Sequence, residues 1–445
     1  MTAPAITPLD AWTRTRLGLA GDGPLHPSHL AAAQLTRLRA TVAWARERSP
    51  FYRQRLAGLP AEPIADLADL ARLPFTTAED LREQPERMLC TGQGEVARIV
   101  TLHSSGTTAQ PKRLFFSPAD LELTLDFFHH GMASLCGPGR TVLILLPGQA
   151  PDSVGDLLAR ALTRLGARPL PHGPVRDPAA TLAVLRASGA DCLVGIPSQV
   201  LALVRHPDAA GLPRGRVRSA LLTTDYVPKA VRRAVGQAWG AEVFNHYGMT
   251  ELGLGGAVEC AAHAGCHLRA ADIYCEVIDP AGRPLPPGQA GELVFTTLNR
   301  EAMPLIRYRS GDLGRLSTRP CACGSALPRL NSLHGRLAKT VDLGGGVTLT
   351  QARLDEAIFA VPGVVNFRAR LILACTGRRL GLEVLTAPGA PPGRRAAVAV
   401  ALAGLAPVRR ALAAGGFSLE PVRLAEADWF TTGVAKRSIQ VEAGD

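Results

Sequence analysis

Lysine and aromatic residues are scarce in this chain of 445 residues. Only four of its 49 Lys and Arg residues are lysines, and Phe, Trp and Tyr together make up 5%. The formal net charge is +11, which could attract nucleic acid or an acidic membrane. The arginines are scattered, however, without a long basic run or interleaved aromatic residues. The composition therefore argues against a nucleic-acid-binding protein, and a lysine at a chemically suited position stands out from the background.

The chain also lacks a long apolar run, a secretory signal and an even set of cysteines. No window holds 18 uninterrupted apolar residues, and the N-terminus has no basic start followed by an apolar stretch. Nine cysteines without a signal make a disulfide framework a poor interpretation. We expect a cytoplasmic protein that does not interact with a membrane.

What is present is enough apolar sequence, 47%, for a large core in two or three domains. Residues 30–49 have helical spacing of apolar positions. Residues 91–240 alternate apolar strand-length runs with helical stretches, which predicts a parallel, helix-covered sheet. Residues 268–317 read as a β-rich unit, and 340–375 as strand, glycine turn, helix and strand. One helix is expected over 396–414.

Hydroxyls and a glycine gather just before the first lysine, in Ser104, Ser105, Gly106, Thr107 and Thr108. Backbone N–H groups and hydroxyls in such a loop can surround a phosphate oxygen, and Lys112 can add a mobile charge. The loop is not a Walker motif. A polar surface loop would explain the same residues.

A second motif, Asn245-His246-Tyr247-Gly248-Met249-Thr250-Glu251, follows a strand-like run. The tyrosine beside a glycine can stack on a planar base, and the Thr250–Glu251 pair can hold a phosphate oxygen and Mg²⁺, which prefers carboxylate ligands. An ordinary strand-to-loop turn is the alternative.

The third motif is Arg307-Tyr308-Arg309-Ser310-Gly311-Asp312. Asp312, after a glycine at a strand end, can accept hydrogen bonds from two ribose hydroxyls. Taken by itself, this aspartate is better explained as a β-turn residue.

The order and spacing of these motifs, with SPFYRQRL (49–56) and LPFTTAEDLRE (73–83), resemble the adenylate-forming acyl- and aryl-CoA ligases, most closely the phenylacetate–CoA ligase branch. The resemblance implies an α/β fold: a large N-terminal adenylate-forming domain with mainly parallel sheets and a β-rich subdomain, over 1–334. A small, mobile α+β C-terminal domain would follow over 335–445.

The resemblance also assigns roles. The loop Ser104 to Thr108 with Lys112 would hold the ATP phosphates. Asn245, Tyr247, Gly248, Thr250 and Glu251 would contact adenine, the α-phosphate and Mg²⁺. The remaining assigned positions are Asp312 at the ribose, Thr223, Thr224 and Asp225 beside the adenine, and Arg336 in the Gly-Arg pair before the interdomain hinge.

The implied reaction joins a carboxylic acid to coenzyme A (CoA) through an acyl-adenylate, with ATP, Mg²⁺ and CoA, and without a covalent enzyme intermediate. An aromatic acid is expected, although Ala270–Tyr274 departs from the acidic segment of the family, which argues against phenylacetate itself. A homodimer is the family expectation. The alternatives are delivery to a separate carrier protein or an amine, and a non-catalytic, zinc-stabilised nucleotide-binding protein.

Two positions depart from the family. The acidic pair after Gly-Arg is replaced by Leu337 and Ala338, and the lysine that completes adenylation is replaced by Val434. Lys436 lies two residues later, which in an extended segment keeps the same face at a shift of about 6–7 Å. We therefore assign the catalytic lysine to Lys436.

Four cysteines form a further constellation, Cys260-x5-Cys266-His267 and Cys321-Ala322-Cys323. Four N/S ligands make a closed, structural Zn²⁺ site, although free thiols would fit the spacing almost as well. Some members of the resembled branch carry such a zinc. Cys260, Cys321 and Cys323 are the expected ligands, and the fourth is Cys266 or His267, with His267 preferred because the family has a histidine there.

Overall fold

This computed structural model describes residues 7–19, 25–60, 62, 64–102, 110–336, 340–375, 377–425 and 437–444, without the side chains of 332–336. The chain forms two compact units, each assembled from several stretches. The first contains 1–137, 151–165 and 246–333, and the second contains 138–150, 166–245 and 334–445. The backbone passes from one unit to the other within strand β7 (Glu242–Tyr247). The domain division at 334/335 stays a prediction.

The second unit contains the parallel sheet that the strand–helix alternation predicts, in the order β4-β3-β5-β6-β7. Its strands and the helices between them are β3 (Thr141–Ile144), β4 (Arg168–Pro171), α7 (Pro178–Ser188), β5 (Cys192–Gly195), α8 (Pro197–Arg205), β6 (Ser219–Leu222) and α9 (Lys229–Trp239). Every residue of β5 and β6 is buried, as expected of parallel strands covered on both faces. The predicted fold class is confirmed here.

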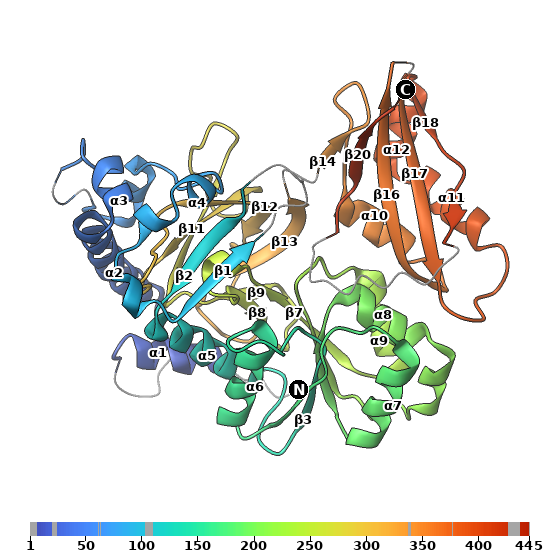
Figure 1. Ribbon diagram of the computed structural model, residues 1–445, viewed down its shortest axis with the longest axis horizontal. Helices are drawn as coiled ribbons and strands as arrows, with labels where there is room; N and C mark the ends of the chain where they lie inside the picture. The colour runs from blue at the N-terminus through green and yellow to red at the C-terminus, as the bar shows by residue number, and fades with distance from the viewer. Residues whose placement is uncertain are drawn as a thin grey trace. The chain divides into compact units, whose positions relative to one another are not determined.

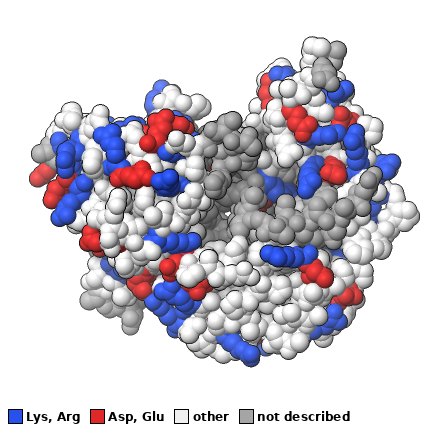
Figure 2. Space-filling view, in the orientation of Figure 1, with Lys and Arg blue, Asp and Glu red and all other residues white. Residues whose placement is uncertain are grey.

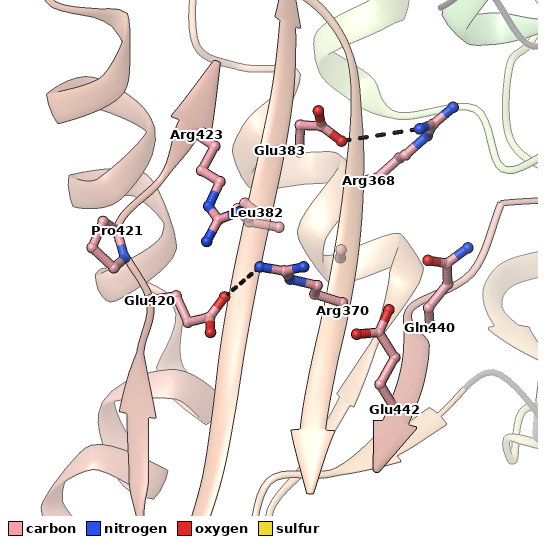
Figure 3. A pocket seen from close by; sticks show the side chains of 10 residues that line it. Arg368, Arg370, Leu382, Glu383, Glu420, Pro421, Arg423, Gln440 and Glu442 are labelled. Carbon is pink, nitrogen blue, oxygen red and sulfur yellow. Dashed lines mark hydrogen bonds and ion pairs between the residues drawn. The ribbon is translucent and has the colours of Figure 1, made fainter. Parts of the chain in front are cut away.

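The C-terminal part of the same unit is a second α+β layer (Figure 1, orange to red). Its elements are β14 (Thr340–Asp342), β15 (Thr348–Thr350), α10 (Gln351–Ile358), β16 (Val364–Ala374), β17 (Gly377–Thr386), α11 (Arg394–Ala403), α12 (Ala406–Ala414), β18 (Phe417–Leu419), β19 (Arg423–Leu424) and β20 (Gln440–Ala443). Strands β18, β17, β16 and β20 form one sheet, which carries a surface pocket of about 210 Å³ (Figure 3). Ion pairs Arg370–Glu420 (3.0 Å) and Arg368–Glu383 (4.0 Å) balance the charges within this pocket.

The single helix predicted over 396–414 is wrong. Two helices, α11 and α12, replace it and are bent by 74° relative to each other. Gly404 ends α11, and Pro407 lies in the first turn of α12, where its missing N–H costs no helical hydrogen bond. Within the described residues no single helix is long and apolar enough to cross a membrane, and only this bent pair passes that test together.

The first unit is dominated by antiparallel strands: β8 (Ala257–Glu259), β9 (Cys266–Leu268), β10 (Ile273–Ile278), β11 (Gly291–Thr297), β12 (Tyr308–Leu316) and β13 (Arg329–Arg336). They run in the order β10-β11-β12-β13-β9-β8, and β8 pairs with the last two residues of β7. This sheet is the β-rich unit that the strand pattern predicts.

Helices and a hairpin complete the first unit. They are α1 (Pro8–Arg16), α2 (Pro27–Arg48), α3 (Pro50–Arg55), α4 (Asp80–Glu83), the pair β1 (Arg98–Leu102) and β2 (Lys112–Phe116), α5 (Pro118–Met132) and α6 (Val154–Arg164). Helix α5 begins at a capping box in which Ser117 accepts from the N–H of Asp120 and Asp120 accepts from the N–H of Ser117. The same carboxylate accepts from the backbone of Glu301 and Ala302, so the cap also fastens α5 to the loop after β11.

The arginine excess does not collect in one patch on the visible face. Figure 2 shows Lys and Arg side chains interspersed with Asp and Glu. Much of the arginine content instead makes specific contacts. Arg307, which is only 2% exposed, forms a two-pronged ion pair with Glu276 (3.1 and 3.0 Å) and donates to the carbonyls of Ala71 (2.7 Å) and Leu73 (2.8 Å). Its guanidinium also lies over the ring of Phe75.

Replacing Arg307 by alanine is expected to destabilise the first unit by about 3–5 kcal/mol, because Glu276 is left as a buried, unpaired charge. Urea unfolding followed by tryptophan fluorescence measures this as a lower midpoint. Arg283→Ala, which removes an exposed partner of Asp279, is the control and should change stability by about 0–1 kcal/mol. Equal midpoints for the two variants would contradict the role of Arg307.

Candidate active site

The first motif is described from Gln110 onward, and Ser104, Ser105, Gly106, Thr107 and Thr108 lie outside the described residues. Lys112 begins strand β2, which the hairpin with β1 holds in place. Its Nζ forms an ion pair with Oε1 of Glu251, 139 residues later in the chain. The structure therefore joins the lysine of the first motif to the carboxylate of the second.

Glu251 lies in a 3₁₀ turn, Thr250–Leu252, and is 3% exposed. Besides Lys112, the hydroxyl of Tyr308 donates to its Oε1 at 3.0 Å. Burial by itself would raise the pKa of this carboxyl, but the charge and hydrogen bond of Lys112, with the Tyr308 hydroxyl, bring the pKa below its usual value. Glu251 is therefore an ionised carboxylate in a buried site.

The turn that carries Glu251 depends on glycine and arginine. A Cβ at Gly248 would lie 1.9 Å from the carbonyl oxygen of Leu254, so no larger residue fits this close approach. The guanidinium of Arg300, itself buried, donates to the backbone carbonyl of Glu251 at 2.6 Å. These contacts fix the backbone on both sides of the carboxylate.

Tyr247 and Asp312 form the second junction. The Tyr247 hydroxyl donates to Oδ2 of Asp312 at 2.8 Å, and the Asp312 N–H donates to the Ser310 hydroxyl at 3.0 Å. Tyr247 also stacks on Phe295, with ring centroids 5.8 Å apart. The base-stacking and ribose-binding residues expected from two separate motifs are thus hydrogen-bonded to each other.

The two N-terminal segments that carry the family resemblance, 49–56 and 73–83, help to hold this site in place. Tyr52 and Thr76 are hydrogen-bonded through their hydroxyls (2.9 Å), and Tyr52 also accepts from the N–H of Ile306 (3.0 Å). The Thr76 backbone forms hydrogen bonds with Arg307 and Arg309, on both sides of Tyr308 at the start of β12. The N-terminal segments thereby hold Tyr308, which in turn holds Glu251.

In the second unit, Thr223, Thr224 and Asp225 follow strand β6, and Asn245 lies in β7. The N–H of Thr223 donates to the carbonyl of Gly195 at 3.1 Å. Thr224 has φ +74°, which is rare for a β-branched residue and marks a strained turn. The side chain of Arg336 and all of Lys436 lie outside the described residues, so the hinge and the shifted lysine stay predictions.

Cys260, His267, Cys321 and Cys323 are all buried, and their ligand atoms lie within 4.8 Å of one another. The distances are 3.7 Å for Cys260 Sγ–Cys321 Sγ and 3.4 Å for Cys323 Sγ–His267 Nε2. Gly324, with φ +82°, donates to the carbonyl of Cys321 and closes the turn that presents the Cys321–Cys323 pair.

Cys266 is not in this group. It neighbours His267 in strand β9, and successive strand side chains point to opposite faces. Burial lowers the pKa of His267 to about 4, which keeps its imidazole neutral at pH 7, as a metal ligand must be. These four side chains could hold a metal ion.

Comparison with known proteins places these features in a family. The AMP-binding enzyme family matches residues 64–299. A phenylacetate-coenzyme A ligase of Thermus thermophilus is 32% identical over 76% of each chain, and one of Pseudomonas putida is 30% identical over 74% of this chain and 75% of its own. A solved 2-hydroxyisobutyryl-CoA ligase superposes with a TM-score of 0.76 at 23% identity, covering 92% of this chain and 89% of the other.

The chain belongs to the AMP-binding enzyme family. Within it, the chain lies in the phenylacetate–CoA ligase-like branch, as the motifs predict. In this AMP-binding enzyme, the first unit brings together Lys112, Glu251, Tyr247 and Asp312 in two hydrogen-bonded pairs.

Two positioning residues of this AMP-binding enzyme escaped the sequence analysis. Tyr308 stands inside a quoted motif, but nothing in the pattern shows that its hydroxyl reaches Glu251. Arg300 belongs to no motif, and one arginine among many carries no sequence signal. Asp272, from the segment that departs from the family, is a buried partner of Arg269 and Arg16 (2.8 and 2.9 Å).

The Lys112–Glu251 pair predicts a pH-dependent stability. The pKa of Glu251 is lower in the folded than in the unfolded chain, so the stabilisation is present above about pH 4.3 and is lost as the pH falls through the folded pKa. Lys112→Met should cost about 3–5 kcal/mol at pH 7, since it leaves a buried charge, and less at pH 4, where Glu251 can take up a proton.

Unfolding of wild type and Lys112→Met between pH 7 and pH 4 measures this difference. Lys229→Met, at an exposed position, is the matched control and should cost less than about 0.5 kcal/mol. If the loss of unfolding free energy in Lys112→Met stayed constant between pH 7 and pH 4, Glu251 would not be the group whose protonation changes the stability.

Proposed function

We propose that this AMP-binding enzyme is an ATP-dependent carboxylate–CoA ligase that acts through an acyl-adenylate, with an aromatic acid as its substrate. The observation that carries the proposal is the joining of three motifs within one unit. Lys112 contacts Glu251, and Tyr247 contacts Asp312, so residues expected at the phosphates, base and ribose form two pairs within the first unit.

The reaction has two steps. A carboxylate oxygen of the acid attacks the α-phosphorus of ATP, the bond to the β-phosphate breaks, and pyrophosphate leaves. The thiol of CoA then attacks the acyl carbon of the adenylate, the bond to AMP breaks, and the thiol proton passes to solvent. Neither step needs a side-chain nucleophile, so the protein contributes positioning and charge neutralisation.

Glu251 and Thr250 are the residues that would hold Mg²⁺. The Glu251 carboxylate fits a cation, because it is ionised and buried and because Mg²⁺ prefers carboxylate oxygens. When bound, Mg²⁺ supplies positive charge against the phosphate oxygens. Lys112 and Glu251 then orient the phosphate end of ATP, while Tyr247 and Asp312 orient its nucleoside.

The aromatic acid class rests on the relatives. Four of them, at 29–32% identity, are phenylacetate-coenzyme A ligases, and two at 24% are feruloyl-CoA synthases. The structural role of Asp272 means that the 270–274 segment offers no acidic group that is free for the substrate. Delivery to a carrier protein, a homodimer and a cytoplasmic location stay predictions.

Pyrophosphate release tests the proposal. Purified protein with ATP and Mg²⁺ is given a panel of aryl and alkyl acids, and release should depend on the acid. Glu251→Gln is expected to lower kcat at least about 100-fold, because it removes a charge aimed at the reacting phosphates. Glu122→Gln, which makes the same chemical change at an exposed ion pair with Arg164, should stay within twofold of wild type.

No release with any acid, despite measurable ATP binding, would reject the ligase. Release that is unchanged in Glu251→Gln would keep the ligase but reject this account of its site.

We also propose that the cluster of Cys260, His267, Cys321 and Cys323 binds a structural Zn²⁺. Tetrahedral ligands at about 2.3 Å from zinc lie about 3.8 Å apart, close to the 3.7 and 3.4 Å found here. Cys260 directly follows β8, which pairs with Tyr247, and Cys321 and Cys323 lie between β12 and β13. The ion would link β8, which pairs with Tyr247, to the segment that follows the strand of Asp312.

Metal analysis of the purified protein should give one zinc per chain. Cys321→Ser is expected to lose the zinc and to lower the melting temperature. Cys266→Ser, at the neighbour of a ligand in β9, is the control that should retain the metal. Zinc lost in Cys266→Ser and retained in Cys321→Ser would contradict this ligand set.

A further inference from the structure

Asp225 sits in the strained turn after β6 and faces the C-terminal part of its own unit. Its Oδ1 accepts from the N–H of Tyr226 at 3.0 Å. Its Oδ2 accepts from the backbone N–H of Arg437 at 3.3 Å and lies 3.6 Å from the Nε of the same residue. The turn with φ +74° at Thr224 thus directs a carboxylate to the residue that directly follows Lys436 in the sequence.

Arg437 is held mainly by the C-terminal part. Its guanidinium lies over the rings of Phe359 (4.5 Å) and Phe367 (4.7 Å). One nitrogen pairs with the buried carboxylate of Asp355 in α10, and another donates to Asn366 in β16 at 3.2 Å. Burial lowers the pKa of Arg437 to about 10, so it is still charged at pH 7.

These contacts are unequal. The buried ion pair with Asp355 and two cation–π contacts bind Arg437 firmly to α10 and β16. The link to Asp225 is a long hydrogen bond and an ion pair of 3.6 Å, both weaker by geometry. Arg437 is therefore held mainly by the C-terminal part, and its contact with Asp225 is the weaker one.

A second contact lies beside the first. The hydroxyl of Tyr226 donates to Glu356 in α10 at 2.6 Å, and Glu356 also accepts from the N–H of Lys229 at the start of α9. Tyr226 thus contacts Glu356 of α10 directly. The preceding residue, Asp225, is linked through Arg437 to the neighbouring α10 residue, Asp355. The turn that the family resemblance assigns to the adenine thus contacts the C-terminal part of its own unit at two points.

We propose that Arg437 is a positioning residue for the adenylation step: it fixes the backbone that directly follows Lys436 to the Thr223–Asp225 turn. This inference rests on the proposed function. It rests also on the role predicted for Lys436, which is to neutralise the charge of the leaving pyrophosphate. That charge develops in the first step only, so the anchor is needed for adenylation and not for the attack of the thiol.

The test separates the two half-reactions in the full-length enzyme. Arg437→Lys keeps the positive charge but loses the planar fork that serves Asp355, Asn366 and Asp225 together. For the acid that wild type uses fastest, kcat of ATP–pyrophosphate exchange should fall at least tenfold, with KM for ATP within twofold. Thioester formation from CoA and the synthetic adenylate of that acid should stay within twofold.

Arg370→Lys is the matched control, since Arg370 lies in β16 of the same C-terminal part and pairs with Glu420 at 3.0 Å (Figure 3). It should leave both half-reactions within twofold. Where Arg437→Lys does not fold, Asp225→Asn decides, because it weakens only the contact that crosses from the turn. It should lower kcat of exchange at saturating ATP, with the Kd for ATP within twofold.

The inference would be overturned if the rates of both half-reactions fell equally in the deciding variant, or if neither fell. A variant that lost only affinity for ATP would overturn it too. Absence of exchange in wild type with every acid would instead overturn the proposed function, and the inference with it.

Discussion

A buried carboxylate has to be paired, and the pairing of Glu251 organises the first unit. Removing its charge from water costs several kcal/mol, which Lys112 and the Tyr308 hydroxyl offset. Three distant segments must therefore meet: the start of β2, the turn after β7 and the start of β12. An ATP-dependent ligase needs the same segments close together, because the negative phosphates of its substrate require cations held by fixed carboxylates.

Other parts of the unit maintain that arrangement. Tyr52 and Thr76 hold the start of β12, and Arg300 holds the backbone of Glu251. The Cys/His cluster joins the end of β8, strand β9 and the segment between β12 and β13, where a metal ion would limit their relative movement. Sequence features that look unrelated, among them two N-terminal segments and residues of three motifs, thus support one carboxylate and one tyrosine–aspartate pair.

Much of this follows from the sequence. Apolar runs of strand length predict the parallel sheet because burial on both faces requires them, and the choice of His267 over Cys266 agrees with the alternation of side chains along a strand. The partners of a buried charge do not follow, because they depend on contacts between residues 49 to 139 positions apart in the chain. Tyr308, Arg300 and Arg437 carry no local signal that separates them from other tyrosines and arginines. The break between α11 and α12 could have been predicted from Gly404 and Pro407, but apolar periodicity outweighed them.

The most direct test of the central claim is to capture the intermediate. Enzyme, MgATP and the best acid of the panel are mixed for a single turnover, quenched in acid and analysed by mass spectrometry, with and without a chase of CoA. We expect an enzyme-bound acyl-adenylate that forms only with acid and ATP together, and that CoA converts to acyl-CoA and AMP. ATP that stays intact with every acid would contradict adenylate formation, and an adenylate that CoA does not consume would contradict CoA as the acceptor.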